Sequence, residues 1–203
     1  MKHAVFPSEP AIFAQSMILI GSSGRNSGKT TLAMELIRRW KVRFSITALK
    51  VTTIAHAGGA CHRGGEGCGA CSIASKYVLE EEQDRGSDKD TIQMLRAGAA
   101  QVFWLRSLRG SLAEAYTGFL EKALPDTLII CESNSLREVV QPGCFIMLKS
   151  GTEDAIKASA AAVANLANIT LPSPLGTRDM DRLLSALVLE RTAQGRPLVR
   201  FVG

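Results

Sequence analysis

A glycine-rich stretch that joins an apolar segment to an amphipathic one is the feature that most constrains this chain. The apolar run 16–20 is followed by GSSGRNSGKTT at positions 21–31, and Leu32, Leu36 and Trp40 then recur at helical spacing. A strand, a glycine-rich loop and a helix in this order direct backbone N–H groups and the positive end of the helix toward one point. The order therefore predicts a phosphate-binding loop.

The last residues of this loop indicate how phosphates would be held. In the pattern G-x-x-x-x-G-K-[ST], the lysine reaches the β- and γ-phosphates and the hydroxyl residue ligates Mg²⁺. Lys29 and Thr30 occupy these two positions, and Ser23 replaces the first glycine, with Gly21 and Gly24 close by. We predict a nucleotide-binding loop, with Lys29 also acting in catalysis, that consists of Gly24, Arg25, Asn26, Ser27, Gly28, Lys29, Thr30 and Thr31.

A carboxylate at the end of a neighbouring strand would complete a magnesium site beside such a loop. Glu132 closes the apolar run 127–132, and the carboxyl ends of parallel strands open onto the ligand crevice. We therefore predict that Glu132 is a catalytic residue and binds Mg²⁺ together with Thr30. The alternative is a strand-terminal carboxylate that meets solvent, and it predicts no magnesium effect from Glu132→Gln.

Short β-rich runs alternate with helical patterns along the rest of the chain. This alternation predicts an α/β fold, a Rossmann-like P-loop NTPase with a mostly parallel sheet and helices on both faces. At 203 residues, we expect a single domain over 1–203, with a Cys/Gly-rich insertion at about 53–87. The expected strands are 16–20, 44–50, 101–106, 127–132, 144–149 and 169–171, and the expected helices are 29–40 and 88–97 with three more that begin near 111, 152 and 177.

Polar residues mark the expected helix ends. Ser111 with Glu114 predicts a capping box, Thr152 and Thr177 are expected N-caps, and Gly98 is an expected C-cap. In the last three helices the faces expected to be buried carry Leu112, Tyr116, Leu120 and Ala123, then Ile156, Ala160, Val163 and Leu166, then Met180, Leu184, Leu187 and Val188.

Charge and hydropathy exclude several classes of protein. The net charge of +5 comes without a run of basic residues, and aromatic residues make up only 5% of the chain, so we expect no nucleic-acid partner. No apolar run approaches the ~18 residues of a membrane span, so we expect no membrane partner. Pro7, Glu9 and Pro10 interrupt any signal-peptide core, which favours a cytoplasmic protein.

Cysteine placement suggests a second metal site. The chain has five cysteines, an odd number that argues against a disulfide framework. Cys61, His62, Cys68 and Cys71 fall in a glycine-rich segment, and a Cys₃His set with a C-x-x-C pair suits zinc, while an iron–sulfur cluster is the other option and His56 an alternative ligand. The alternative without a metal is a glycine-rich loop with reduced, exposed thiols.

Four stretches of the chain resemble the molybdopterin-guanine dinucleotide biosynthesis protein B family, P-loop proteins of the SIMIBI class. They are GSSGRNSGKTTL, ITALKVTT with Lys50 near its centre, GSDKDTIQMLRAGAAQV at 86–102, and LIICES. The resemblance spans about residues 16 to 132. Its most specific feature beyond the loop is Lys89-Asp90-Thr91 followed by Ala97-Gly98-Ala99.

The resemblance implies GTP or ATP binding with Mg²⁺, slow hydrolysis and a homodimer. It implies an accessory role in molybdenum-cofactor biosynthesis, with molybdopterin and a molybdenum-cofactor nucleotidyltransferase as partners. By motif position, Asp90 would lie near the metal or its waters as a catalytic residue, and Lys50 would face the crevice. The alternatives are a metal-center insertase that uses the cysteine-rich segment, a nucleotide sensor that does not hydrolyse, and a small-molecule kinase. No guanine-reading motif is visible, so the choice of GTP over ATP depends on the resemblance alone.

Overall fold

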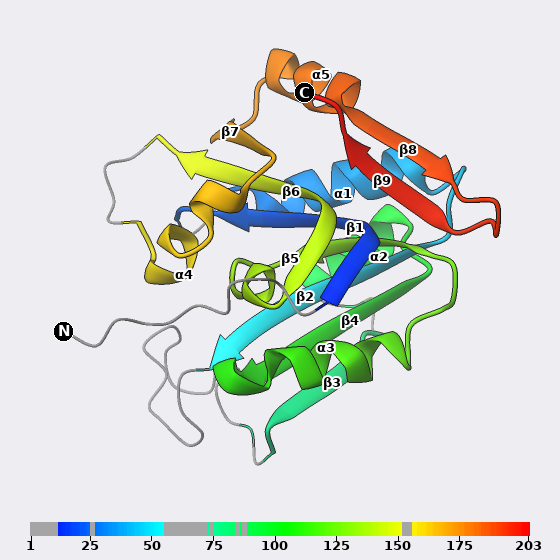
Figure 1. The fold of residues 1–203 in the computed structure, drawn as a ribbon, viewed down its shortest axis with the longest axis vertical. Coiled ribbons are helices and arrows are strands. Elements are labelled where there is room, and N and C mark those ends of the chain that lie inside the picture. The colour runs from blue at the N-terminus through cyan, green and yellow to red at the C-terminus, as the bar shows by residue number, and fades with distance from the viewer. Residues whose placement is uncertain are drawn as a thin grey trace.

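A computed structural model describes residues 12–24, 27–54, 73, 75–83, 86, 89–151 and 156–203. Its main element is a seven-stranded sheet in the order β3-β4-β2-β5-β1-β6-β7 (Figure 1). All neighbouring strands of this sheet are parallel except β3, which pairs antiparallel with β4. The strands are β1 Ile12–Ser22, β2 Ile46–Ile54, β3 Tyr77–Glu81, β4 Gln101–Leu108, β5 Leu128–Glu132, β6 Val140–Ser150 and β7 Ile169–Ser173, with a separate hairpin of β8 Leu187–Arg191 and β9 Pro197–Phe201.

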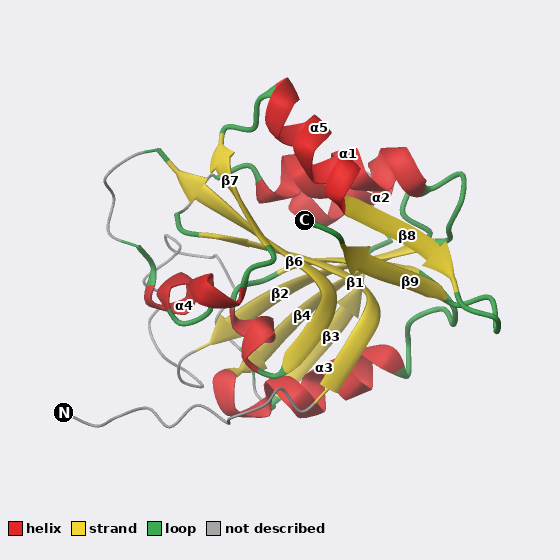
Figure 2. Cartoon of the chain, turned by 45° about the horizontal axis from the view of Figure 1, so that its top comes forward, coloured by secondary structure: helices red, strands yellow, loops and turns green. Residues whose placement is uncertain are grey.

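Helices cover both faces of the sheet, as Figure 2 shows. Alternate residues of β1 point to opposite faces: Ile18 and Ile20 pack in one hydrophobic cluster with α1, α2 and α5, whereas Met17 and Leu19 pack in the other with α3. The expected α/β fold with a mostly parallel sheet is therefore confirmed. The helices are α1 Lys29–Trp40, α2 Asp90–Ala97, α3 Leu112–Leu120, α4 Ala158–Ala161 and α5 Thr177–Ala186, with single 3₁₀ turns η1 Arg109–Ser111, η2 Ser135–Glu138 and η3 Ala164–Leu166.

The lengths of the three central strands create a notch at the carboxyl edge of the sheet. β5 ends at Glu132, whose register partners are Ile20 on β1 and Lys50 on β2. β1 continues to Ser22 and β2 continues to Ile54 beyond this level. The end of β5 therefore forms the floor of a depression between two longer strands.

Three helix boundaries agree with the sequence, the two ends of α1 and the end of α2. α1 spans Lys29–Trp40 as expected. α2 ends at Gly98, which has a φ of 111° and donates its backbone N–H to the carbonyl of Leu95. This left-handed conformation suits a glycine C-cap.

The expected capping box of α3 is wrong. The Ser111 side chain makes no cap hydrogen bond, and the Glu114 carboxylate instead accepts a hydrogen bond from Lys76 Nζ at 3.0 Å. Because an ammonium group competes well with a backbone N–H for a carboxylate, the ion pair replaces the box. The buried face also differs, since Phe119 is fully buried while Leu120 is 42% exposed.

The C-terminal region also departs from the expected helices. The expected cap Thr152 lies outside the described residues. In place of the long helix expected after it, the described residues form the short α4 and the 3₁₀ turn η3, and Ile156 and Leu166 are exposed. α5 begins after Gly176, whose N–H donates to Asp179 at 3.1 Å, so Thr177 is its first residue rather than its cap.

The last expected helix extends beyond the observed end of α5 at Ala186. Leu187 and Val188 belong to β8, because the chain changes there from helical spacing to alternation, with Leu187 and Leu189 buried.

The long section between β2 and α2 contains an element that the sequence did not indicate. β3 lies within the proposed insertion at 53–87, where no strand was expected, and it forms one edge of the sheet. The remaining residues of the proposed insertion mostly lie outside those described. Across the described residues, none of the helices is long and apolar enough to pass through a membrane.

Tyr116 offers a test of the packing around α3. Its hydroxyl is buried and has no hydrogen-bond partner among the described residues, and its ring lies 5.7 Å from that of Phe119. We expect Tyr116→Phe to leave the free energy of unfolding unchanged or to raise it by up to about 1 kcal/mol, because it removes an unsatisfied polar group. Phe119→Ala, the matched control, should lower it by about 3–5 kcal/mol. Urea unfolding measures both, and a clear loss of stability in Tyr116→Phe would contradict this packing.

Candidate functional site

A cleft of about 750 Å³ opens at the carboxyl edge of the sheet, above the notch at the end of β5. It collects residues from five separate segments of the chain between Ser27 and Ser159. Its walls are formed by Ser27, Gly28, Lys29, Thr30, Thr31, Lys50, Val51, Thr52, Thr53, Asp90, Gln93, Glu132, Ser133, Asn134, Ser135, Lys157 and Ser159. The residues from Ser27 to Thr31 were all predicted for a nucleotide-binding loop, and the cleft brings them together with Lys50, Asp90 and Glu132.

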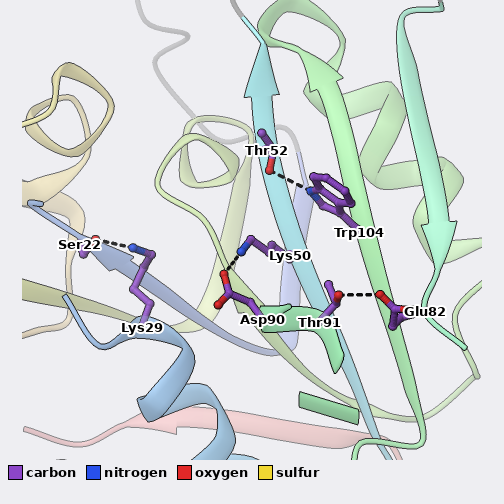
Figure 3. Close-up of polar contacts among 8 residues, drawn as sticks. All are labelled: Ser22, Lys29, Lys50, Thr52, Glu82, Asp90, Thr91 and Trp104. Carbon is purple, nitrogen blue, oxygen red and sulfur yellow. Dashed lines mark hydrogen bonds and ion pairs between the residues drawn. The ribbon is translucent and has the colours of Figure 1, made fainter. Parts of the chain in front are cut away.

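The loop before α1 turns at a glycine and folds its lysine back. Gly28 has a φ of 67°, and its carbonyl accepts the N–H of Leu32 at 2.9 Å, the first bond of α1. Lys29 Nζ donates to Ser22 Oγ at 2.7 Å (Figure 3). The Ser22 hydroxyl in turn donates to the Gly24 carbonyl at 2.9 Å. The ammonium group of Lys29 therefore lies over the loop and faces the cleft.

Glu132 is buried at the floor of the cleft and is only 3% exposed. The Thr30 side chain forms a hydrogen bond with its carboxylate, while Oε1 has no hydrogen-bond partner among the described residues. Burial raises the pKa of the Glu132 carboxyl, and the nearby Lys50 and Lys29 ammonium groups and the Thr30 bond oppose this rise. The alternative of a strand-terminal carboxylate that meets solvent is therefore wrong.

Lys50 and Asp90 form an ion pair across the cleft from Lys29 (Figure 3). Asp90 is the first residue of α2, and the next residue, Thr91, donates its hydroxyl to Glu82 at 2.8 Å. Lys29, Lys50, Asp90 and Glu132 thus converge on one cleft. Burial lowers the pKa of Lys29, and the positive charge of Lys50 lowers it further, against the raising effect of Glu132 and Asp90.

Sequence reasoning missed the part that Asn134 plays. Its side chain bonds to the backbone of Ser22 in both directions: Oδ1 accepts the Ser22 N–H at 2.8 Å and Nδ2 donates to the Ser22 carbonyl at 3.0 Å. Gly21 is required beside it, because a Cβ at that position would lie 2.7 Å from Asn134 Oδ1. The signal available in the sequence was an amide residue just after a buried strand.

Lys157 is a second residue that the sequence did not single out. Its backbone N–H donates to the Ser23 carbonyl at 3.1 Å, and its Nζ donates to the Gly24 carbonyl at 2.9 Å. No local pattern could have indicated contacts with residues more than 130 positions earlier in the chain.

The residues at the cleft floor suit a magnesium ion. The Thr30 hydroxyl, the Glu132 carboxylate and the Asp90 carboxylate are hard oxygen ligands, the kind that Mg²⁺ prefers. The unpartnered Oε1 of Glu132 is a buried acceptor that such an ion could satisfy. The oxygen ligands of Thr30, Glu132 and Asp90 therefore fit the ligand preference of Mg²⁺.

The other predicted metal site is not described. Cys61, His62, Cys68 and Cys71 lie outside the described residues, as do Arg25 and Asn26 of the loop. Among the residues that are described, no group of three or more His, Cys, Asp or Glu side chains could hold a metal ion.

No protein-family model, no curated protein and no solved structure matches this chain.

The raised pKa of Glu132 has a measurable consequence for stability. Because the folded state binds the proton of this carboxyl more tightly than the unfolded state, the native carboxyl makes wild type progressively less stable as pH rises above its ordinary pKa of 4.5. The side chain at position 132 of the Glu132→Gln variant cannot ionise. We therefore expect the melting temperature of Glu132→Gln minus that of wild type to increase from pH 4.5 to pH 8, in nucleotide-free buffer without divalent cations. If this difference in melting temperature stays constant with pH, or shifts in favour of wild type at high pH, Glu132 is not buried as described.

Proposed function

We propose that this protein is a P-loop nucleotide-binding protein that binds a nucleoside triphosphate with Mg²⁺ in the cleft and hydrolyses it slowly. One observation carries the proposal. The Lys29 ammonium and the Thr30 hydroxyl, from the first turn of α1, line the same cleft as a buried carboxylate, Glu132, with an unpartnered oxygen.

Phosphate binding follows from the start of α1. Backbone N–H groups of the first helical turn have no partners within the helix, and the helix dipole favours a negative charge there. Lys29 bonds to a neutral hydroxyl, that of Ser22, and a phosphate oxygen is a stronger acceptor for an ammonium group. Lys29 would therefore exchange Ser22 for the β- and γ-phosphates.

Thr30, Glu132 and Asp90 would hold the magnesium ion directly or through its waters. When bound, Mg²⁺ neutralises negative charge on the phosphates. Lys50 holds Asp90 in place through their ion pair, and Thr30 orients the Glu132 carboxylate. In this proposal the buried carboxylate of Glu132 also accepts the proton of the attacking water.

For the biological role we propose an accessory function in molybdenum-cofactor biosynthesis, with GTP as the nucleotide. The support is the set of residues that carry the sequence resemblance, of which Lys29, Lys50, Asp90 and Glu132 meet in one cleft. Molybdopterin, a molybdenum-cofactor nucleotidyltransferase and a second copy of the chain are the proposed partners.

Lys29→Ala tests the nucleotide site. We expect the affinity for Mg-GTP and Mg-ATP, measured by isothermal titration calorimetry, to fall by about a hundredfold or more, since a charge-assisted contact to phosphate is lost. The melting temperature without nucleotide should remain close to that of wild type. Lys149→Ala is the control, because Lys149 is an exposed lysine at the end of β6 that does not line the cleft. Equal affinity in Lys29→Ala and Lys149→Ala would refute the proposal.

Native mass spectrometry of the purified protein tests the biological role. We expect a bound guanine nucleotide and, in protein from cells that make molybdenum cofactor, a pterin adduct. The same spectrum reports any zinc or iron–sulfur cluster, and such a metal without a pterin would favour the metal-insertion alternative over this role. Nucleotide with neither pterin nor metal would leave the nucleotide site supported and the pathway rejected.

A further inference from the structure

Asn134 connects the two halves of the cleft, the phosphate-binding loop and the buried carboxylate. It stands two residues after Glu132 and directly before η2. The backbone between them is held to β1, because the N–H of Ser133 donates to the Ile20 carbonyl at 3.0 Å. From this anchored position the carboxamide of Asn134 binds the N–H and the carbonyl of Ser22, at 2.8 Å and 3.0 Å. The chain after Glu132 and the chain before the loop are therefore fixed to each other at Ile20 and at Ser22.

The carboxamide of Asn134 has a defined orientation. Its Nδ2 donates to Ser159 Oγ at 3.4 Å as well as to the Ser22 carbonyl, so both of its N–H groups and its oxygen are engaged. The group also fits closely against β1, since a Cβ on Gly21 would lie only 2.7 Å from Oδ1. The amide therefore holds Ser22 in one place relative to the end of β5.

Ser22 transmits this placement to the lysine of the loop. Its hydroxyl accepts the hydrogen bond of Lys29 Nζ at 2.7 Å (Figure 3). Glu132, the proposed magnesium ligand, lies two residues before Asn134 in the chain and lines the same cleft as Lys29. Asn134 thus lies between the group proposed to bind phosphate and the group proposed to bind magnesium.

The distance between these two groups matters for a nucleotide that binds with Mg²⁺. The ion bridges phosphate oxygens, so the protein groups that hold the ion and those that hold the phosphates must act on one ligand at the same time. Such a constellation works only when its members are held within about 0.5 Å of the productive geometry. A residue that fixes the distance therefore strengthens the effect of each ligand on the other more than it strengthens the binding of either ligand alone.

We infer that Asn134 is a positioning residue, which sets the distance between the phosphate-binding loop and Glu132 so that phosphate and Mg²⁺ bind together. The inference rests on the proposed function and deepens it. In this role Asn134 acts through Ser22 and Lys29 rather than on the nucleotide itself. The alternative is a purely structural role, in which the amide stabilises the fold and nothing more.

Asn168 provides a matched control for that alternative. Its Oδ1 accepts the N–H of Phe145 on β6 at 2.7 Å, and its own N–H donates to the Phe145 carbonyl at 2.9 Å. It therefore holds the backbone of a strand much as Asn134 does, but it is not one of the residues that line the cleft. We expect Asn134→Ala and Asn168→Ala both to lower the melting temperature, because each leaves a strand N–H without its side-chain acceptor.

The test compares the affinity for GTP with Mg²⁺ and with EDTA, measured by isothermal titration calorimetry. The ratio of the two affinities is the factor by which Mg²⁺ strengthens binding, and we expect about 5 to 150 in wild type and in Asn168→Ala. In Asn134→Ala we expect the ratio to fall toward one, the value for ligands that do not influence each other, while the affinity in EDTA stays within about threefold of wild type. Asn134→Leu should behave in the same way, because it fills the space of the side chain and lacks only the hydrogen bonds.

Several results would overturn the inference. They are a wild-type ratio in either Asn134 variant, an equal fall of the ratio in Asn168→Ala, a ratio of one in wild type, and failure of both Asn134 variants to fold, which would make the residue purely structural. If wild type binds GTP neither with nor without Mg²⁺, the proposed function fails as well. If Lys29→Ala loses binding while both Asn134 variants keep the wild-type ratio, only the inference fails.

Discussion

The burial of one carboxylate, Glu132, sets the arrangement of the whole cleft. Taking a carboxylate out of water is unfavourable, and the cost is reduced only when hydrogen-bond donors and cations approach it. Thr30 supplies the donor, and Lys50 and Lys29 supply positive charge. These groups come from the start of α1 and from the middle of β2. The early end of β5 is therefore linked to the positions of α1 and β2.

Attachments from distant parts of the chain fix the loop before α1. Asn134 binds the backbone of Ser22 in both directions, much as a neighbouring strand would, and so extends the sheet beyond the end of β5. Lys157 binds the carbonyls of Ser23 and Gly24. Such attachments suit the proposed phosphate-binding role of this loop, because a pre-formed site loses less conformational entropy when a ligand binds.

The sequence predicted the features that depend on neighbouring residues and missed those that depend on residues remote in the chain. The bounds of α1, the C-cap at Gly98 and the place of Glu132 at the carboxyl end of β5 depend on neighbouring residues, and the sequence predicted all three. Asn134 and Lys157 act on residues 112 and 133 positions away, so no local pattern shows what they contact, and the place of Asn134 just after a buried strand was the one signal available for it. The capping box at Ser111 failed because Lys76, remote in sequence, pairs with Glu114. The hairpin of β8 and β9 was missed because its first residues continue the apolar spacing of α5.

Burial shifts the pKa of both Lys29 and Glu132 at the cleft. This common cause affects how a nucleotide and a magnesium ion would bind there together. Burial disfavours the charged form of Lys29 and of Glu132 alike, and in the nucleotide-free protein each group is balanced mainly by its oppositely charged neighbours. A ligand that brings phosphates and a divalent cation together would give each group a partner of its own: phosphate oxygens for Lys29 and the cation for Glu132. Either component alone would stabilise one group and leave the other with only its present neighbours. Nucleotide and magnesium binding at this cleft are therefore expected to reinforce each other.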